Sequence, residues 1–191
     1  METKLNNKRI AVVVADGFEE SEFLIPLNAL KEQSATVDVI SLKPGKVKAW
    51  RETNWGGEYM VDKVIEEVNS DDYDALLLPG GVMSPDQLRM NEDVIDFVAG
   101  FMENKKPVAA ICHGLLTLIE TDMLAGRTLT SFPSIRTDLI NAGADWVDEE
   151  VVCDQGFVTS RRPADLPAFC AKMIEEFAEG IRDRAKNPEV V

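Results

Sequence analysis

Short apolar runs recur along the chain and alternate with segments whose apolar residues repeat at helical spacing. The runs have the length and the β-branched or aliphatic character of buried parallel strands. They are Arg9–Ala15, Thr36–Leu42, Ala75–Leu78 and Val108–Ile111. Helical spacing begins at Ser21 and recurs over Glu92–Glu103, Ser134–Asn141 and Pro163–Ala178. This order predicts one three-layer α/β domain with a mostly parallel central sheet.

Two segments depart from the alternation. Lys43–Asp62 is polar and contains glycines, so we interpret it as a flap or hairpin outside the main sheet, with Trp50 and Trp55 as its anchors. Trp146–Val152 and Phe157–Ser160 are predicted strands on either side of a turn.

Three smaller expectations complete the outline. Val64–Val68 is a predicted short helix, and Pro79-Gly80-Gly81 ends a strand and opens a loop. We place the domain at residues 9–180 and expect polar tails at 1–8 and 181–191.

The segment Pro107–Glu120 is predicted to join a strand directly to a helix. Its two most reactive side chains lie where the strand ends and the helix begins. Cys112 and His113 follow the strand, while Leu115 and Leu118 already repeat at helical spacing. A thiol at the start of a helix loses its proton more easily, and the thiolate is a nucleophile. The amide after the nucleophile is well placed to hold an oxyanion. We favour this interpretation over a buried structural Cys beside the only histidine of the chain.

Two further loops are expected to meet this elbow, because ligands bind beyond the carboxyl ends of parallel strands. The first loop contains four acids: Asp16, Glu19, Glu20 and Glu22. We expect three to be solvated and one to face the thiol as a protonated carboxyl. In the second loop, Gly80-Gly81 offers amides for an oxyanion hole or forms a simple tight turn.

Composition narrows the possible functions. The chain has 191 residues and a formal net charge of −14, which argues against nucleic acid or an anionic membrane as the main partner. Three cysteines without paired spacing form no disulfide framework, and we see no signal peptide or membrane span. A cytoplasmic location follows from these features. Nucleotide-binding glycine motifs and a zinc ligand set are absent from the sequence, so we expect no cofactor and no metal.

Several motifs together resemble those of the ThiJ/PfpI family. They are Ala-Asp-Gly-Phe-Glu-Glu-Ser-Glu near the start, Leu-Leu-Leu-Pro-Gly-Gly, and Ala-Ala-Ile-Cys-His-Gly at the elbow. The likeness continues through Thr130–Ile135, Asn141–Asp148 and Val158–Pro167, and it spans about Arg9 to Phe177. Within the family, the chain is most similar to the PfpI intracellular protease and general stress protein branch.

The resemblance implies a flavodoxin-like sandwich and a role for each site residue. Cys112 would be the nucleophile, His113 its base, Glu22 the acid bonded to the cysteine and Glu19 a second acid. The amides of Gly81 and His113 would form the oxyanion hole. An acid from the adjacent subunit would complete the triad, and Asp86 matches it after a one-residue shift, with Asp in place of Glu. A shared site implies a homo-oligomer, either a dimer or a hexamer.

Three activities remain open. The first is a stress-related cysteine hydrolase that acts on peptides or glycated proteins, as an intracellular peptidase or a deglycase. The second is glutathione-independent conversion of methylglyoxal to lactate, with Glu22 as acid and base. The third is non-enzymatic: a redox sensor whose Cys112 oxidises readily, or a holding chaperone.

Overall fold

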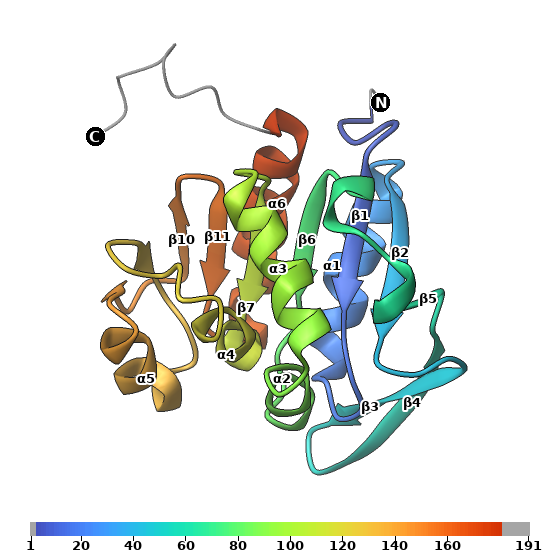
Figure 1. Ribbon diagram of the computed structural model, residues 1–191, viewed down its shortest axis with the longest axis horizontal. Coiled ribbons are helices and arrows are strands. Elements are labelled where there is room, and N and C mark those ends of the chain that lie inside the picture. Colours follow the sequence, from blue (N-terminus) through green and yellow to red (C-terminus); the bar gives the residue numbers. More distant parts are fainter. Residues whose placement is uncertain (1–2, 181–191) are drawn as a thin grey trace.

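A mostly parallel sheet of seven strands forms the centre of the protein in the computed structural model, which describes residues 3–180 (Figure 1). Its strand order is β10-β11-β7-β6-β1-β2-β5. Only β10 runs antiparallel to its neighbour. The strands are β1 (Arg9–Val13), β2 (Thr36–Ser41), β5 (Lys63–Val64), β6 (Ala75–Leu78), β7 (Val108–Ile111), β10 (Val151–Asp154) and β11 (Phe157–Ser160). The predicted fold class is confirmed.

Helices cover both faces of the sheet. They are α1 (Glu20–Glu32), α2 (Met83–Leu88), α3 (Glu92–Glu103), α4 (Leu116–Ile119), α5 (Arg136–Asn141) and α6 (Leu166–Glu179). Figure 1 shows α2, α3 and α4 in front of the sheet and α1 and α6 behind it. Parallel strands between two helical layers are buried on both faces, which explains their continuous apolar runs.

Alternate residues of the central strand divide between two hydrophobic cores. Ile10 and Val12 of β1 pack with the inner faces of α1 and α6. Ala11 and Val13 pack with α3 and its aromatic residues on the other side. The strand ends at Val13 rather than Ala15, although Val14 and Ala15 remain buried.

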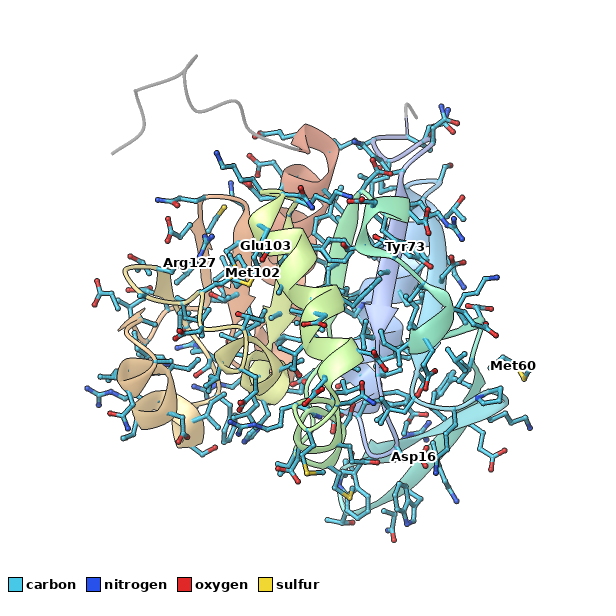
Figure 2. All side chains as sticks on the ribbon, viewed as in Figure 1. Asp16, Met60, Tyr73, Met102, Glu103 and Arg127 are labelled. Carbon is cyan, nitrogen blue, oxygen red and sulfur yellow. The ribbon has the colours of Figure 1, made fainter. Side chains whose placement is uncertain are left out.

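The polar excursion is a hairpin outside the main sheet, as predicted. It consists of β3 (Lys46–Arg51) and β4 (Asn54–Met60), and the rings of Trp50 and Trp55 meet edge to face at 5.6 Å. Asp16 accepts a hydrogen bond from the Lys48 amide at 2.7 Å, which ties the hairpin to the loop after β1. Figure 2 shows Asp16 on this side of the molecule and Met60 projecting outward.

Several predicted boundaries are wrong. The loop after Pro79-Gly80-Gly81 contains the helix α2. The short helix predicted at Val64–Val68 is present but shorter: Val64 ends β5, and a 3-10 helix spans Ile65–Glu67.

The predicted strand Trp146–Val152 is divided between two sheets. Trp146 belongs to a small pair formed by β8 (Thr128–Leu129) and β9 (Asp145–Trp146), whereas Val151 begins β10. The polar residues between them break the apolar alternation that a single strand would need.

One residue of the predicted N-terminal tail is packed against the domain. Leu5 is fully buried, and its amide donates to the carbonyl of Gln33 at 3.1 Å, whereas Lys4, Asn6 and Asn7 are exposed. The domain bounds of 9–180 stay a prediction. The predicted tail at 181–191 lies outside the described residues. No helix within residues 3–180 is long and apolar enough to cross a membrane.

Candidate active site

Three loops meet at the carboxyl ends of β1, β6 and β7. The amide of Glu19 donates to the carbonyl of Gly80 at 3.0 Å, which joins the first loop to the second. Gly80 lies between the other groups: a Cβ there would contact the carboxyl of Glu22 and would come within 2.7 Å of the Cys112 Cβ. Only a residue without a side chain lets these loops approach so closely.

Cys112 occupies the turn immediately after β7. Its φ of +62° is unusual for a residue other than glycine, while the preceding Ile111 is extended. Such a backbone conformation persists only where the surroundings enforce it, and it is common at reactive positions. The thiol is buried, and its Sγ lies 3.2 Å from Nδ1 of His113.

The His113 ring has a neighbour on each side. Its Nε2 lies 2.9 Å from Oγ of Ser134, and its plane stacks on the Phe132 ring at a centroid distance of 4.9 Å. Burial lowers the pKa of His113, so the neutral ring is favoured near neutral pH.

Glu22 faces the thiol from the first turn of α1. Its side chain is fully buried, and no hydrogen bond of normal geometry reaches either carboxyl oxygen within residues 3–180. Burial raises the pKa of Glu22 to about 8, and the nearby Cys112 thiol and Gly80 amide oppose part of this rise. The carboxyl therefore holds its proton at neutral pH, as predicted for the acid that faces the cysteine.

The surroundings of the Cys112 thiol act on its pKa in opposite directions. Burial raises the pKa of Cys112, and the neighbouring Glu22 raises it further, against the effect of the amides of His113 and Gly81. The element after the cysteine is only a 3-10 turn, Cys112–Leu115, followed by the short α4. Such a short helix supplies too little dipole to offset the burial.

The amides of His113 and Gly81 are the groups that stabilise the thiolate. Gly81 has φ of +84°, and a Cβ would lie 2.6 Å from the carbonyl oxygen of Gly17. The chain can make this turn only with glycine, and the turn aims the amide at the sulfur. Both donors predicted for the oxyanion hole therefore approach the nucleophile.

The other acids of the first loop have different roles. Glu19 precedes α1, and its carboxylate accepts a hydrogen bond from the Ser21 hydroxyl at 2.9 Å. The prediction that Glu20 is solvated is wrong, because this side chain is buried beneath the hairpin. There it pairs with Arg51 and accepts hydrogen bonds from the Tyr59 hydroxyl at 2.6 Å and the Gly57 amide at 2.8 Å.

Asp86 lies apart from these groups in the chain. It is exposed on α2, and none of the contacts found within residues 3–180 joins its carboxylate to Cys112 or His113. Large apolar side chains are exposed around it: Val82, Met83 and Met90.

Sequence reasoning missed Phe132 and Ser134 as site residues. Both lie in the segment 130–135, which resembles the corresponding motif of the family. That resemblance alone assigns no role to either side chain. In the described part of the chain, no group of three or more potential metal ligands was found.

A mostly parallel α/β sheet with a cysteine on a sharp strand-to-helix turn, flanked by a histidine and a buried acid, defines a class of nucleophile-elbow proteins. Within that class, the chain belongs to the DJ-1/PfpI family, whose model matches residues 8–176.

Individual relatives support the same assignment. General stress protein 18 of Bacillus subtilis is 49% identical over 163 residues, which are 85% of this chain and 93% of that protein. Protein/nucleic acid deglycase 2 of Escherichia coli is 43% identical over 164 residues, covering 85% and 94% of the two chains. The crystal structure of Drosophila melanogaster DJ-1beta matches with a TM-score of 0.81 and 31% identity over 90% of each chain.

Proposed function

We propose that this protein is a stress-related, cysteine-dependent hydrolase of the PfpI type, which acts on glycated proteins or peptides. The observation that carries the proposal is the position of the Cys112 thiol, whose Sγ lies 3.2 Å from Nδ1 of His113 and which faces the buried carboxyl of Glu22. The names of the relatives, a stress protein and a deglycase, support this assignment.

The geometry supports a nucleophilic mechanism. Cys112 gives its proton to Nδ1 of His113, and its sulfur attacks the substrate carbonyl to form a C–S bond and an oxyanion. The amides of Gly81 and His113 stabilise the oxyanion. For a peptide bond or another amide, the C–N bond of the attacked carbon then breaks and the amine leaves with the proton from His113. Water cleaves the acyl-sulfur bond and returns a proton to the thiol.

Glu22 assists this reaction as a hydrogen-bond donor. Because its carboxyl is protonated near neutral pH, it donates to the sulfur and favours the thiolate once the proton has moved to His113. The same protonated carboxyl also suits the conversion of methylglyoxal to lactate, in which an acid and base next to the thiol moves a proton between carbon atoms.

We also propose that copies of the chain associate through α2. The exposed Val82, Met83 and Met90 surround Asp86, and apolar groups of this kind mark contact surfaces. Association would carry Asp86 of one copy toward the site of another. None of the three cysteines, all of which lie within residues 3–180, forms a disulfide, and this suits a reducing compartment such as the cytoplasm.

The test compares wild type with Cys112→Ala on three substrates. These are a peptide whose lysine has reacted with methylglyoxal, a fluorescent casein, and methylglyoxal itself. We expect wild type to restore the unmodified lysine side chain of the peptide, and the rate to fall at least about 100-fold in the variant, because the nucleophile is gone. Cys153→Ala serves as the control, because Cys153 lies in β10, which forms the edge of the sheet.

The outcomes separate the alternatives. Lactate as the only product assigns the protein to the glyoxalase reaction. Equal rates for wild type and Cys112→Ala on all three substrates contradict a hydrolase, and selective oxidation of Cys112 by peroxide would then identify a sensor.

A further inference from the structure

Both ring nitrogens of the only histidine have partners from the same chain. Nδ1 lies 3.2 Å from Cys112 Sγ, and Nε2 lies 2.9 Å from Ser134 Oγ. The Phe132 ring covers one face of the imidazole. The histidine is therefore fixed by two hydrogen-bond partners and one stacked ring before any other subunit contributes.

A hydroxyl is a different kind of partner from a carboxylate. It donates or accepts a hydrogen bond and carries no charge, whereas a carboxylate only accepts and stabilises the imidazolium. When the thiol donates to Nδ1, the proton of the neutral ring resides on Nε2 and is donated to Ser134 Oγ. This arrangement leaves the Nδ1 lone pair directed at the Cys112 thiol, as a base requires.

The segment that carries Ser134 is held in place without its hydroxyl. The Phe132 amide donates to the Cys112 carbonyl at 3.3 Å, so the segment is bonded directly to the elbow. The 3-10 turn Pro133–Ile135 closes through the Ile135 amide, which donates to the Phe132 carbonyl at 3.2 Å. Since backbone bonds fix the turn, the hydroxyl is available to orient the ring.

We propose that Ser134 is a positioning residue that orients His113 toward Cys112 within a single subunit. The inference rests on the proposed function, since it concerns the base of that reaction. It concerns only groups of one chain: Cys112, His113 and Ser134.

The charged and titratable surroundings of the ring are few. Cys112 contacts it directly, and Glu22 lies beyond the sulfur. Arg136, two residues after Ser134, lies over the Trp146 ring at 5.2 Å. A new charge at position 134 should therefore act on the ring of His113 with little competition.

The first experiment uses the single histidine as its own reporter. The imidazole signal is titrated by NMR in wild type, Ser134→Asp and Thr137→Asp. A carboxylate next to Nε2 favours the charged ring, so we expect Ser134→Asp to raise the pKa of His113 by about one unit. Thr137→Asp adds the same charge to an exposed position of α5 and should shift this pKa by less than a third as much.

The second measurement reports the reactivity of the Cys112 thiol rather than the pKa of His113. The rate at which iodoacetamide alkylates Cys112 at pH 7, resolved by peptide mass spectrometry, should fall about fivefold in Ser134→Ala, the effect of losing one neutral hydrogen bond. Ser134→Thr keeps a hydroxyl and should stay within about twofold of wild type. Thr137→Ala removes a hydroxyl from an exposed position of α5 and should leave the rate unchanged.

Either of two results overturns the proposal: equal shifts in the pKa of His113 for the two Asp variants, or a wild-type alkylation rate in Ser134→Ala. Neither measurement needs a substrate. Failure of the proposed hydrolase reaction would therefore appear in the turnover assays alone and remain distinguishable from failure of this inference.

Discussion

The two buried glutamates of α1 stand two residues apart and have opposite protonation. Glu20 points toward the β3–β4 hairpin, where Arg51, Tyr59 and Gly57 surround its carboxylate and lower its pKa to about 2. Glu22 points toward the elbow, where burial raises its pKa to about 8. Residues two positions apart lie on different sides of a helix. The helix α1 therefore places one glutamate against the hairpin and the other against the elbow.

The comparison shows that partners decide the charge of a buried carboxyl. Both side chains are almost completely covered. Glu20 stays ionised because a guanidinium, a hydroxyl and an amide all donate to it, and its structural role is to attach the hairpin. Burial raises the pKa of Glu22, the charge of nearby Glu19 raises it further, and one thiol and one amide do not offset these two effects.

The largest expected effect is on catalysis at Glu22. Glu22→Gln keeps the shape of the side chain and a hydrogen-bond donor but cannot release or accept a carboxyl proton, so we expect turnover of methylglyoxal to fall about 100-fold, the lower range for general acid–base catalysis. In wild type, activity that requires the protonated carboxyl should decline as the pH rises through about 8. Turnover against pH for both proteins provides the measurement, with Glu19→Gln as the control; unaltered turnover in Glu22→Gln would remove its catalytic role.

The next largest effect is on stability at Glu20. Glu20→Gln loses the charged acceptor of three donors, and we expect the free energy of unfolding at pH 7 to fall by about 1–2 kcal/mol, since hydrogen bonds to charged groups contribute somewhat more than neutral ones. Because folding lowers the pKa of this carboxyl from 4.5 to about 2, its contribution is complete above about pH 4.5 and is lost as the pH falls toward 2.

Urea unfolding of wild type and Glu20→Gln at several pH values between 7 and 3 measures this contribution. The difference between the two proteins should shrink toward the acid end. A constant difference would mean that Glu20 acts through its shape and not through its charge.

The smallest effect is expected at Tyr59, which donates one of the bonds to Glu20. Tyr59→Phe keeps the ring, which packs against Phe18 and Phe23, and removes only the hydroxyl. We expect a loss of about 1 kcal/mol, measured by urea unfolding at pH 7. The control is Tyr73→Phe, which removes a hydroxyl that donates to Asp38 instead. It shows how much the free energy of unfolding falls when a tyrosine hydroxyl is lost elsewhere in the protein. A loss in Tyr59→Phe as large as that of Glu20→Gln would indicate that the hydroxyl, not Arg51, holds the carboxylate.

The central strands and α3 were predictable because their signals are local. Ala75–Leu78, Val108–Ile111 and Glu92–Glu103 have the bounds that the apolar pattern predicted. Parallel strands that are buried on both faces consist of continuous apolar runs. Such runs can be recognised in the sequence without knowledge of the tertiary contacts. The family assignment was equally accessible, because several motifs occur together in one order.

What could not be predicted depends on contacts distant in sequence. Glu20 finds its partners more than thirty positions away on a hairpin of otherwise polar residues, so its acid run looked solvated. The approach of Ser134 to His113 joins positions 21 apart. The raised pKa of Cys112 depends on burial, which a helix-start argument does not include. The role predicted for Asp86 requires a second copy and stays a prediction.

Gly80 sets a limit on how this site could be redesigned. Any side chain there would occupy space already held by the Glu22 carboxyl and the Cys112 Cβ. In a saturation library selected for new substrates, codon 80 should therefore stay fixed as glycine. Attempts to enlarge the site would have to begin at other positions, because this one glycine lets the acid and the nucleophile approach each other.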